Sequence, residues 1–443
     1  MSLTRQQIAA HFSGEFILPA DPGYAEVSDG YQNPGAPAVV LLPATAVQVA
    51  EALALVQQLG LPVTIRSGGH NNAGLSTNRG GIVISLAHIN DIQRLDDHGR
   101  VRVGSGATWG AVAEALRPHQ LAISSGDTRT VGVGGLTLGG GIGWMVRKFG
   151  LALDSLLAVE LVTVDGRILR ASRDEHAELF WAVRGAGANF GVVTYFEFAA
   201  QRVPKVTYNT IMYSQDEVPA LLRNWRDAVR GSREDVTSSF TLLPSFGEGM
   251  PPMVWVLACY AGPAAEAEPH LARLAQLATP ISVESKEVDY ADVLEDGQPP
   301  EGMQIVVKNI FLQSLTDEAI DAIAAVNSQP GMRVFQLRHL GGAVARVPAE
   351  ETAFAFRDSE IMMFSAAFFP GDATSEVIEA GMQGWQALAR QHGRGSYINF
   401  LSTASAEDVA DIYPTATRAR LAALKREYDP HNLLNSNYNV LPA

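Results

Sequence analysis

Two glycine-rich stretches in the first third of the chain constrain its fold more than any other feature. The first is Ile65-Arg-Ser-Gly-Gly-His-Asn-Asn-Ala-Gly-Leu-Ser76, and the second is Val131-Gly-Val-Gly-Gly-Leu-Thr-Leu-Gly-Gly-Gly-Ile-Gly143. Glycine costs conformational entropy on folding and is useful where the backbone turns with positive φ or lies against a ligand. Because successive N–H groups in such turns can bind a pyrophosphate, the two stretches indicate a large phosphate-bearing ligand. Tight turns between strands remain the alternative.

His70 lies among the glycines of the first stretch. Gly68, Gly69 and Gly74 remove side-chain bulk around its ring, so a large group can approach it. The other histidines show no metal-ligand spacing, and the sequence therefore predicts no metal site. The single cysteine, Cys259, permits neither an internal disulfide nor a cysteine-based zinc site, and we predict a buried, inert thiol.

Length and charge limit the class of protein. A chain of 443 residues exceeds the usual size of one core, which predicts two domains. The net charge is −14 with the acidic residues dispersed, which argues against nucleic acid and against an anionic membrane surface. The sequence contains no charge-free apolar run of ~20 residues, so we predict no membrane span. The N-terminus lacks the apolar run of a signal peptide, so we predict a cytoplasmic protein.

The hydrophobic pattern predicts an α+β chain in which the spacing of the expected strands changes near Pro204. Before it, we expect helices at 46–59, capped by Thr45, and from Thr108 to Pro118. Strands are expected at 61–67, 81–86 and 100–104, with a hairpin formed by 157–164 and 167–171. After it, strands at 206–212, 239–243, 253–260, 333–340 and 360–369 alternate with helices at 216–230, 263–277, 317–328 and 374–391. This order predicts an antiparallel sheet covered by helices on one face. Two further helices are expected in the tail, at 406–412 and 415–427.

The glycine spacings do not fit the common nucleotide-binding motifs. The closest approach to G-x-G-x-x-G is Gly185-Ala-Gly-Ala-Asn-Phe-Gly191, which is one residue too long. In the second stretch, Thr137 stands where the third glycine would be required, and no Walker-type G-K-[ST] is present. We therefore expect no dinucleotide bound in the Rossmann manner.

Several motifs together resemble the FAD-linked oxidases of the berberine-bridge-enzyme type, within the vanillyl-alcohol-oxidase or PCMH-type FAD-binding superfamily. They are Arg66-Ser-Gly-Gly-His70, Val131-Gly-Val-Gly-Gly135, Gly139-Gly-Gly-Ile-Gly143, Arg184-Gly-Ala-Gly-Ala-Asn-Phe-Gly191 and Lys425-Arg-Glu-Tyr-Asp-Pro-His-Asn432, followed by Asn435-Ser-Asn437. The matches run in order from about residue 36 to the tail. The resemblance implies an FAD-binding domain over 1–204 (core about 36–204), a substrate-binding domain over 205–396, and a segment 397–443 that completes the FAD domain.

The resemblance also implies the cofactor site. His70 would carry the flavin through a covalent 8α bond, and the pyrophosphate would lie on residues 66–70 and 132–135. The implied cofactor-binding residues are His70, Arg66, Ser67, Gly68, Gly69, Asn71, Gly74, Thr130, Val131, Gly132, Gly134, Gly135, Gly139, Gly140, Gly141, Gly143, Gly191, Val192, Val193, Asn435 and Asn437.

The sequence departs from the family pattern at three positions. Many relatives attach the flavin a second time through a cysteine where this chain has Thr128, so we predict attachment to His70 only. A tyrosine that serves as base in relatives is Phe400 here, and Phe354 stands where a histidine is frequent. Val131 occupies the position that controls oxygen access in the family, where a small residue favours an oxidase; the alternative is that Val131 only packs.

The resemblance implies transfer of a hydride from a small organic substrate to flavin N5, and reoxidation of the flavin by O2 with release of H2O2. An alcohol donor also needs a base, for which Tyr397 beside Asn399 ranks first; its alternative role is packing with a hydrogen-bonded hydroxyl. The other candidates are Tyr195, Tyr438, Glu360 and Asp358. A dehydrogenase of the same fold and a non-catalytic flavin-retaining protein remain alternatives. The sequence indicates neither the substrate, whether alcohol, sugar, amine or natural-product intermediate, nor the oligomeric state.

Overall fold

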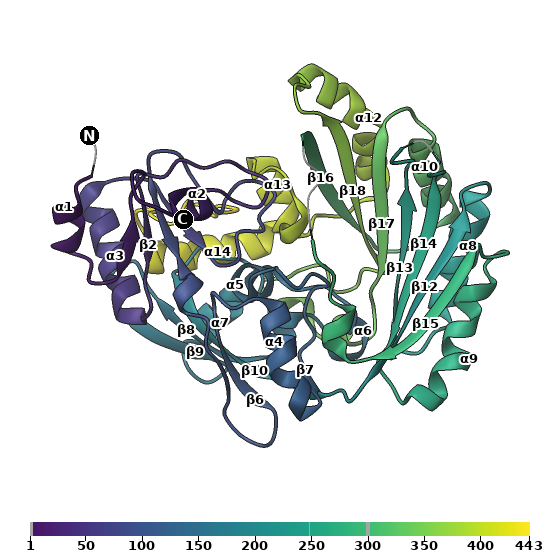
Figure 1. Ribbon diagram of the computed structural model, residues 1–443, viewed down its shortest axis with the longest axis horizontal. Coiled ribbons are helices and arrows are strands. Elements are labelled where there is room, and N and C mark those ends of the chain that lie inside the picture. The colour runs from purple at the N-terminus through teal and green to yellow at the C-terminus, as the bar shows by residue number, and fades with distance from the viewer. Residues whose placement is uncertain (1–2, 248, 298–301) are drawn as a thin grey trace.

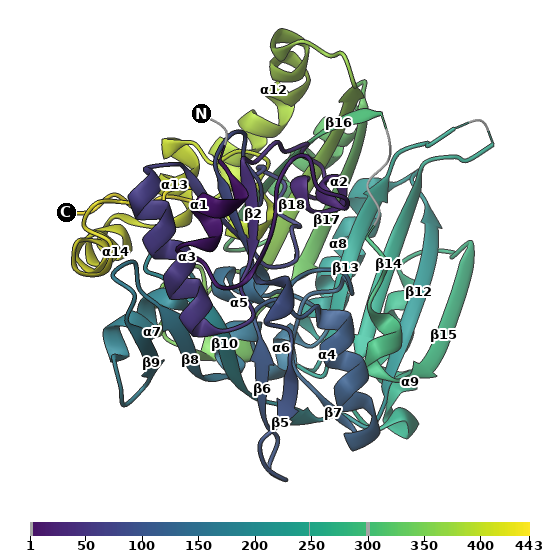
Figure 2. The ribbon, with the colours of Figure 1, turned by 60° about the vertical axis from the view of Figure 1, so that its left-hand side comes forward.

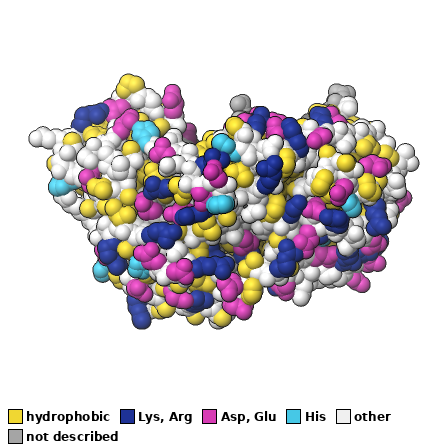
Figure 3. All heavy atoms as spheres, turned by 90° about the horizontal axis from the view of Figure 1, so that it is seen from below, with side chains coloured by type: hydrophobic (Ala, Val, Ile, Leu, Met, Phe, Trp, Pro, Cys, Tyr) yellow, Lys and Arg dark blue, Asp and Glu magenta, His cyan; other side chains and the backbone are white. Residues whose placement is uncertain are grey.

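The computed structural model describes residues 3–247, 249–297 and 302–443. Its elements form two lobes, with the smaller sheets and the tail in one and a large twisted sheet in the other (Figure 1). The chain thus has the predicted α+β architecture, with an antiparallel sheet covered by helices. Lys and Arg side chains are interspersed with Asp and Glu across the face seen in Figure 3. No helix in these described ranges is long and apolar enough to cross a membrane.

The first lobe contains a four-stranded and a five-stranded sheet. In the first, of order β1-β2-β4-β3, β2, β4 and β3 are parallel and β1 pairs antiparallel at the edge. The second is antiparallel, of order β5-β6-β10-β8-β9, and a short pair joins β7 to β11. The strands are β1 (Glu15–Ile17), β2 (Val39–Leu42), β3 (Val63–Arg66), β4 (Ile82–Ser85), β5 (Ile92–Arg94), β6 (Arg100–Gly104), β7 (Leu121–Ala122), β8 (Leu156–Val162), β9 (Ile168–Ser172), β10 (Val192–Ala199) and β11 (Gln201–Arg202).

Helix capping by threonine, predicted from the sequence, is confirmed twice in this lobe. The Thr45 hydroxyl accepts a hydrogen bond from the Gln48 N–H at the start of α3 (Ala46–Leu59), and Thr108 does the same at α4 (Trp109–Leu116). Each cap satisfies a backbone N–H that the helix itself leaves without a partner. The lobe's other helices are α1 (Arg5–Ala9), α2 (Tyr24–Ser28), α5 (Val133–Gly139), α6 (Val146–Phe149) and α7 (Ala177–Val183).

The second lobe is built on a seven-stranded antiparallel sheet of order β15-β12-β14-β13-β17-β18-β16. All five predicted strands are present. Two more were not predicted, the edge strands β15 and β16. The strands are β12 (Val206–Ser214), β13 (Val236–Leu243), β14 (Met253–Tyr260), β15 (Ser282–Val288), β16 (Met303–Leu312), β17 (Met332–His339) and β18 (Ile361–Pro370).

Helices cover the outer face of this sheet and leave the other face toward the first lobe (Figures 1 and 2). They are α8 (Val218–Arg230), α9 (Ala267–Leu271), α10 (Asp317–Asn327) and α12 (Ser375–His392); the first three lie within predicted helical segments, and α12 extends one residue past the predicted 374–391. The buried core between sheet and helices includes Trp225, Phe240 and Trp385. A short helix, α11 (Ala343–Arg346), follows β17 and lies against α6 of the first lobe.

A buried arginine joins the lobes. Arg147 of α6 donates hydrogen bonds to the carbonyls of Leu340, Arg233 and Val236 in the second lobe. Burial lowers the pKa of this guanidinium to about 10, so it remains charged at neutral pH. Because Val236 begins β13 and Leu340 directly follows β17, Arg147 connects α6 to two strands of the large sheet.

The tail returns to the first lobe. Helices α13 (Ala406–Ile412) and α14 (Thr415–Tyr428) confirm the two predicted tail helices, and α14 lies against α7. Tyr397, Leu421 and Tyr438 belong to the same buried core as Phe196 of β10. This return agrees with a segment that completes the first lobe, and the exact boundaries 1–204, 205–396 and 397–443 stay a prediction.

Candidate functional site

A cavity of about 450 Å³ lies between the lobes. The two glycine stretches, the turn at 126–128, residues 186–188, the tail segments 397–400 and 436–438, and strands β16 and β18 all contribute to its lining. The predicted site residues among its lining are Arg66, Ser67, Gly68, Gly69, His70, Asn71, Val131, Gly132, Gly135, Gly139, Tyr397, Asn399 and Asn437.

The two glycine stretches cross each other in one wall of this cavity. A Cβ on Gly68 would lie 2.4 Å from the backbone N of Gly132, and a Cβ on Gly132 would lie 2.2 Å from the backbone N of Gly68. Glycine is required at both positions because any side chain would separate the two backbones. Gly135 differs, because a Cβ there would meet nothing within 4 Å. Part of the glycine content therefore serves contact between the two loops.

Polar backbone groups in the first stretch remain available to a ligand. Within the described ranges, no residue accepts a hydrogen bond from the backbone N–H of Gly68, Gly69, His70 or Asn71. Consecutive free N–H groups in a turn form a concave donor surface for an anion. In the tail, the buried Oδ1 of Asn437 has no donor among the described residues. The wall thus offers donors for phosphate oxygens and one acceptor for a ligand N–H.

His70 lies in this wall with its ring stacked on Tyr31. The ring centroids are 4.2 Å apart, and the ring planes are inclined by 23°. Burial lowers the pKa of the His70 imidazole, so the neutral form, with a free nitrogen lone pair, dominates at neutral pH. Tyr31 was missed by sequence reasoning, because an isolated aromatic residue in a loop carries no pattern.

Thr128 and Cys259, the two positions considered for a second bond to the flavin, differ in their access to the cavity. Thr128 lines the cavity, and its methyl group would lie 2.8 Å from a Cβ placed on Gly297. Cys259 is fully buried in β14, and desolvation raises the pKa of its thiol to about 12. The predicted buried thiol is confirmed, and it does not line the cavity.

The opposite wall is apolar and comes from the second lobe. Strands β16 and β18 contribute Ile305, Val307, Phe364, Ala366 and Phe368. Phe400 of the tail stacks on Phe364 with ring centroids 5.0 Å apart. Sequence reasoning missed the first two of these strand residues because β16 was not predicted.

Tyr397 and Asn399 form a hydrogen-bonded pair beneath the second glycine stretch. The Tyr397 hydroxyl accepts hydrogen bonds from the Gly141 N–H at 2.9 Å and from the Asn399 amide at 2.8 Å. Asn399 also donates to the Leu136 carbonyl in the middle of α5. Burial raises the pKa of the Tyr397 phenol to about 12. This arrangement supports the backbone of residues 136–141.

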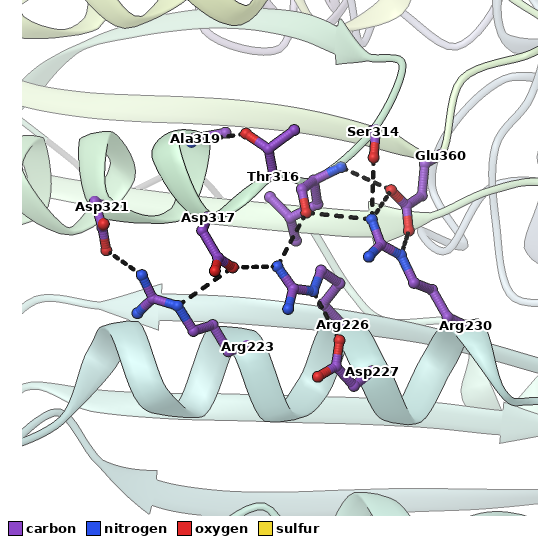
Figure 4. A network of polar contacts seen from close by, with 11 residues as sticks. Arg223, Arg226, Asp227, Arg230, Ser314, Thr316, Asp317, Ala319, Asp321 and Glu360 are labelled. Carbon is purple, nitrogen blue, oxygen red and sulfur yellow. Dashed lines mark hydrogen bonds and ion pairs between the residues drawn. The ribbon is translucent and has the colours of Figure 1, made fainter.

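Of the other candidate bases, only Tyr438 lies in the lining, where its hydroxyl donates to the Leu401 carbonyl. Glu360 is paired with Arg230 and accepts from the Leu315 N–H beside helices α8 and α10 (Figure 4). Asp358 is paired with Arg394. Tyr195 contacts Asp91 outside the cavity. Three of the four alternative bases therefore lie outside the lining of this cavity.

Ten predicted cofactor-binding residues do not line the cavity. Val192 and Val193 point into two hydrophobic cores, and a Cβ on Gly143 would lie 2.1 Å from the Ser125 carbonyl oxygen. Thr130 and Asn435 are exposed. The other residues absent from the lining are Gly74, Gly134, Gly140, Gly141 and Gly191.

Comparison with known proteins identifies the class. The FAD binding domain family matches residues 37–172. The (R)-6-hydroxynicotine oxidase of Paenarthrobacter nicotinovorans is 32% identical, and the match covers 97% of each chain. The crystal structure of 6-hydroxy-D-nicotine oxidase from Arthrobacter nicotinovorans superposes with a TM-score of 0.86 over 98% of both chains at 30% identity. A berberine-bridge-enzyme-like protein of Physcomitrella patens shares the fold, with a TM-score of 0.88 at 22% identity over 99% of this chain and 98% of that one.

Fold, cavity and relatives define an FAD-dependent oxidoreductase. The chain belongs to the PCMH-type FAD-linked oxidase family, and the resemblance to berberine-bridge-enzyme-like proteins is confirmed. The cavity fits the cofactor, because free N–H groups, a free amide acceptor at Asn437 and open space at Gly135 occur in one wall.

Proposed function

We propose that this protein is an oxidase that holds FAD covalently through His70 alone and returns electrons to O2. The observation that carries the proposal is the position of a neutral imidazole in the cavity wall, next to four free backbone N–H groups. Thr128 offers no thiolate, and Cys259 is inaccessible, so the chain offers no cysteine for a second bond to the flavin.

FAD, when bound, accepts a hydride from the substrate and transfers the electrons to O2. The protein's own residues supply binding and orientation. The N–H groups of 68–71 would hold the pyrophosphate, and Asn437 would accept from the ring system. Val131 both lines the cavity and packs against the core, and we propose that its small side chain leaves room for O2. The apolar wall would exclude water from the reacting groups.

We propose a positioning role for Tyr397 and Asn399. A phenol with a pKa of about 12, already accepting two hydrogen bonds, is a weak base at neutral pH. The substitution Tyr397→Phe is expected to lower stability by about 1–3 kcal/mol, because the buried Gly141 N–H loses its acceptor. The rate of flavin reduction should change by less than about tenfold, whereas loss of a general base costs about 10²–10⁴-fold. Stopped-flow reduction and thermal unfolding of the same variant check both parts, and a loss beyond about a hundredfold would restore Tyr397 as the base.

The oxidase proposal is tested without any substrate. Flavin reduced by dithionite under anaerobic conditions should reoxidise within seconds when mixed with air-saturated buffer, with one H2O2 formed per flavin. Slow reoxidation by air, together with fast reoxidation by a quinone or a dye, would instead identify a dehydrogenase of the same fold. A preparation without any flavin absorbance after incubation with FAD would favour the non-catalytic alternative.

A further inference from the structure

Asp127 is a carboxylate in the cavity wall to which the proposed oxidase mechanism assigns no role. Among the described lining residues it is the only Asp or Glu. Its Oδ2 lies 2.5 Å from Nη2 of Arg338 on β17, and its Oδ1 accepts from the Thr128 hydroxyl at 3.2 Å. With 22% of the side chain exposed, the carboxylate is held by protein groups and still reaches the cavity.

Arg338 joins this carboxylate to the aromatic wall. Its guanidinium carbon lies 5.1 Å from the centroid of the Phe400 ring and 5.7 Å from that of Phe364. Nη1 donates to the Ile142 carbonyl and Nε to Gln336, so three of the five guanidinium N–H donors, counting the one to Asp127, have acceptors within the protein. Its position therefore fixes Asp127 next to the two stacked rings.

Two carboxyl groups, those of Asp127 and Glu295, lie near the single guanidinium of Arg338. Glu295 interacts with both Asp127 and Arg338, and burial followed by the Asp127 charge raises the pKa of its carboxyl. With both carboxylates ionised, the two acids and one arginine carry a net charge of −1. Arg66, the only arginine that lines the cavity among the described residues, is directed away toward the carbonyls of Val27 and Asp29. A cation is thus favoured at Asp127 and is not repelled by Arg66.

The apolar part of the wall limits which kind of molecule can bring a cationic group into the cavity. The five side chains from β16 and β18 that line the cavity are all apolar: Ile305, Val307, Phe364, Ala366 and Phe368. A sugar presents hydroxyl groups that need polar partners when they are buried. An aromatic or aliphatic body instead gains from contact with Phe364 and Phe400.

We propose that the substrate is an apolar amine whose ammonium group binds at Asp127 while its hydrocarbon part lies against Phe364, Phe368 and Phe400. This inference rests on the proposed oxidase function and names its substrate class. In the reaction, the ammonium loses one proton to solvent, and the Cα–H bond then breaks with its electron pair as the C=N bond forms. FAD, when bound, would accept this hydrogen and its electron pair and deliver them to O2, which with one proton from solvent leaves as H2O2. Asp127 acts as a specificity residue, and the proton does not need to pass through it.

The test measures binding under anaerobic conditions, from changes in the flavin spectrum of the holoenzyme. The probes are phenethylamine, its neutral counterpart 2-phenylethanol, and the disaccharide chitobiose. We expect phenethylamine to bind about 10- to 100-fold more tightly than 2-phenylethanol, which is the range for a hydrogen bond to a charged group. Chitobiose should bind more weakly than either. If phenethylamine binds no more tightly than 2-phenylethanol, the proposal is wrong.

Two variants separate charge recognition from a purely structural role. Asp127→Asn should raise the Kd and KM for phenethylamine by about 10- to 100-fold, with kcat at saturation and the Kd of 2-phenylethanol changed far less. Arg338→Met keeps an apolar stem against the rings and makes the site more negative, so phenethylamine should bind at least as well as to the parent. Equal weakening of both ligands in both variants would show that the Asp127–Arg338 pair only supports the wall. Reoxidation of dithionite-reduced flavin by air is independent of these ligands, so the oxidase proposal can fail separately.

Discussion

Replacing His70 by alanine is expected to convert acid-stable flavin into flavin that is released on denaturation. In the parent protein, trichloroacetic acid should give a yellow precipitate over a colourless supernatant, because the bond to His70 survives unfolding. In His70→Ala the colour should move to the supernatant, because Thr128 and the buried Cys259 offer no alternative nucleophile. Absorbance of both fractions near the flavin maximum is the measurement.

The free N–H groups of residues 68–71 remain in this variant, so His70→Ala should still bind FAD non-covalently. A matched control is Cys259→Ser, which removes the single thiol of the chain without changing the cavity lining. It should retain the yellow precipitate. A yellow precipitate from His70→Ala would refute the central assignment, and its loss from Cys259→Ser would point to the thiol instead.

Replacing Lys425 by methionine is expected to destabilise the first lobe by about 3–5 kcal/mol, because it leaves the Asp429 carboxylate buried without its cation. Both side chains of this pair have 0% exposure, and their charged atoms are 2.8 Å apart. Lys425 also donates to the carbonyls of Asn189 and Leu434. The carboxylate accepts from two backbone N–H groups of the tail. Urea unfolding followed by tryptophan fluorescence measures the change.

Two comparisons make this prediction specific. Arg346→Met removes one partner of an ion pair with 58% and 45% exposure and should cost no more than about 1 kcal/mol. The double substitution Lys425→Met with Asp429→Leu removes both charges and should recover part of the loss. If Lys425→Met proved as mild as Arg346→Met, the buried pair would not fix the tail in the way described. Loss of FAD binding should accompany the destabilisation, because Asn437 lies in the segment that the pair anchors.

The first glycine stretch was correctly predicted to be a turn after a strand, whereas the second was not correctly predicted in detail. Residues 133–139 form α5 although three of the seven are glycine, which is a poor helix former. Tertiary contact overrides that propensity: a Cβ on Gly134 would lie 3.1 Å from the Ser67 Cβ. The helix thus packs closely against the first stretch. No reading of local pattern could reveal this contact.

The apolar wall of the cavity was hardest to predict. Strand β16 carries Lys308 and Asn309 in its middle, and these polar residues interrupt the apolar pattern of a buried strand. Both are satisfied by the distant tail, Lys308 by Asp408 and Asn309 by the Tyr397 carbonyl. The sequence position of Asp127 indicates only weakly that it belongs to the site, because it directly precedes the position at which many relatives attach their flavin. Its pairing with Arg338 depends on two segments more than two hundred residues apart.

The return of the tail has a consequence for the order of biosynthesis. Residues 65–76 leave the ribosome early, but the cavity also needs residues 397–400 and 436–438, which are made more than three hundred residues later. A nascent chain can form the parallel strands β2, β3 and β4 and even the glycine crossing, yet it cannot enclose a ligand. We therefore expect the complete cofactor cavity to form only after residues 436–438 have been made.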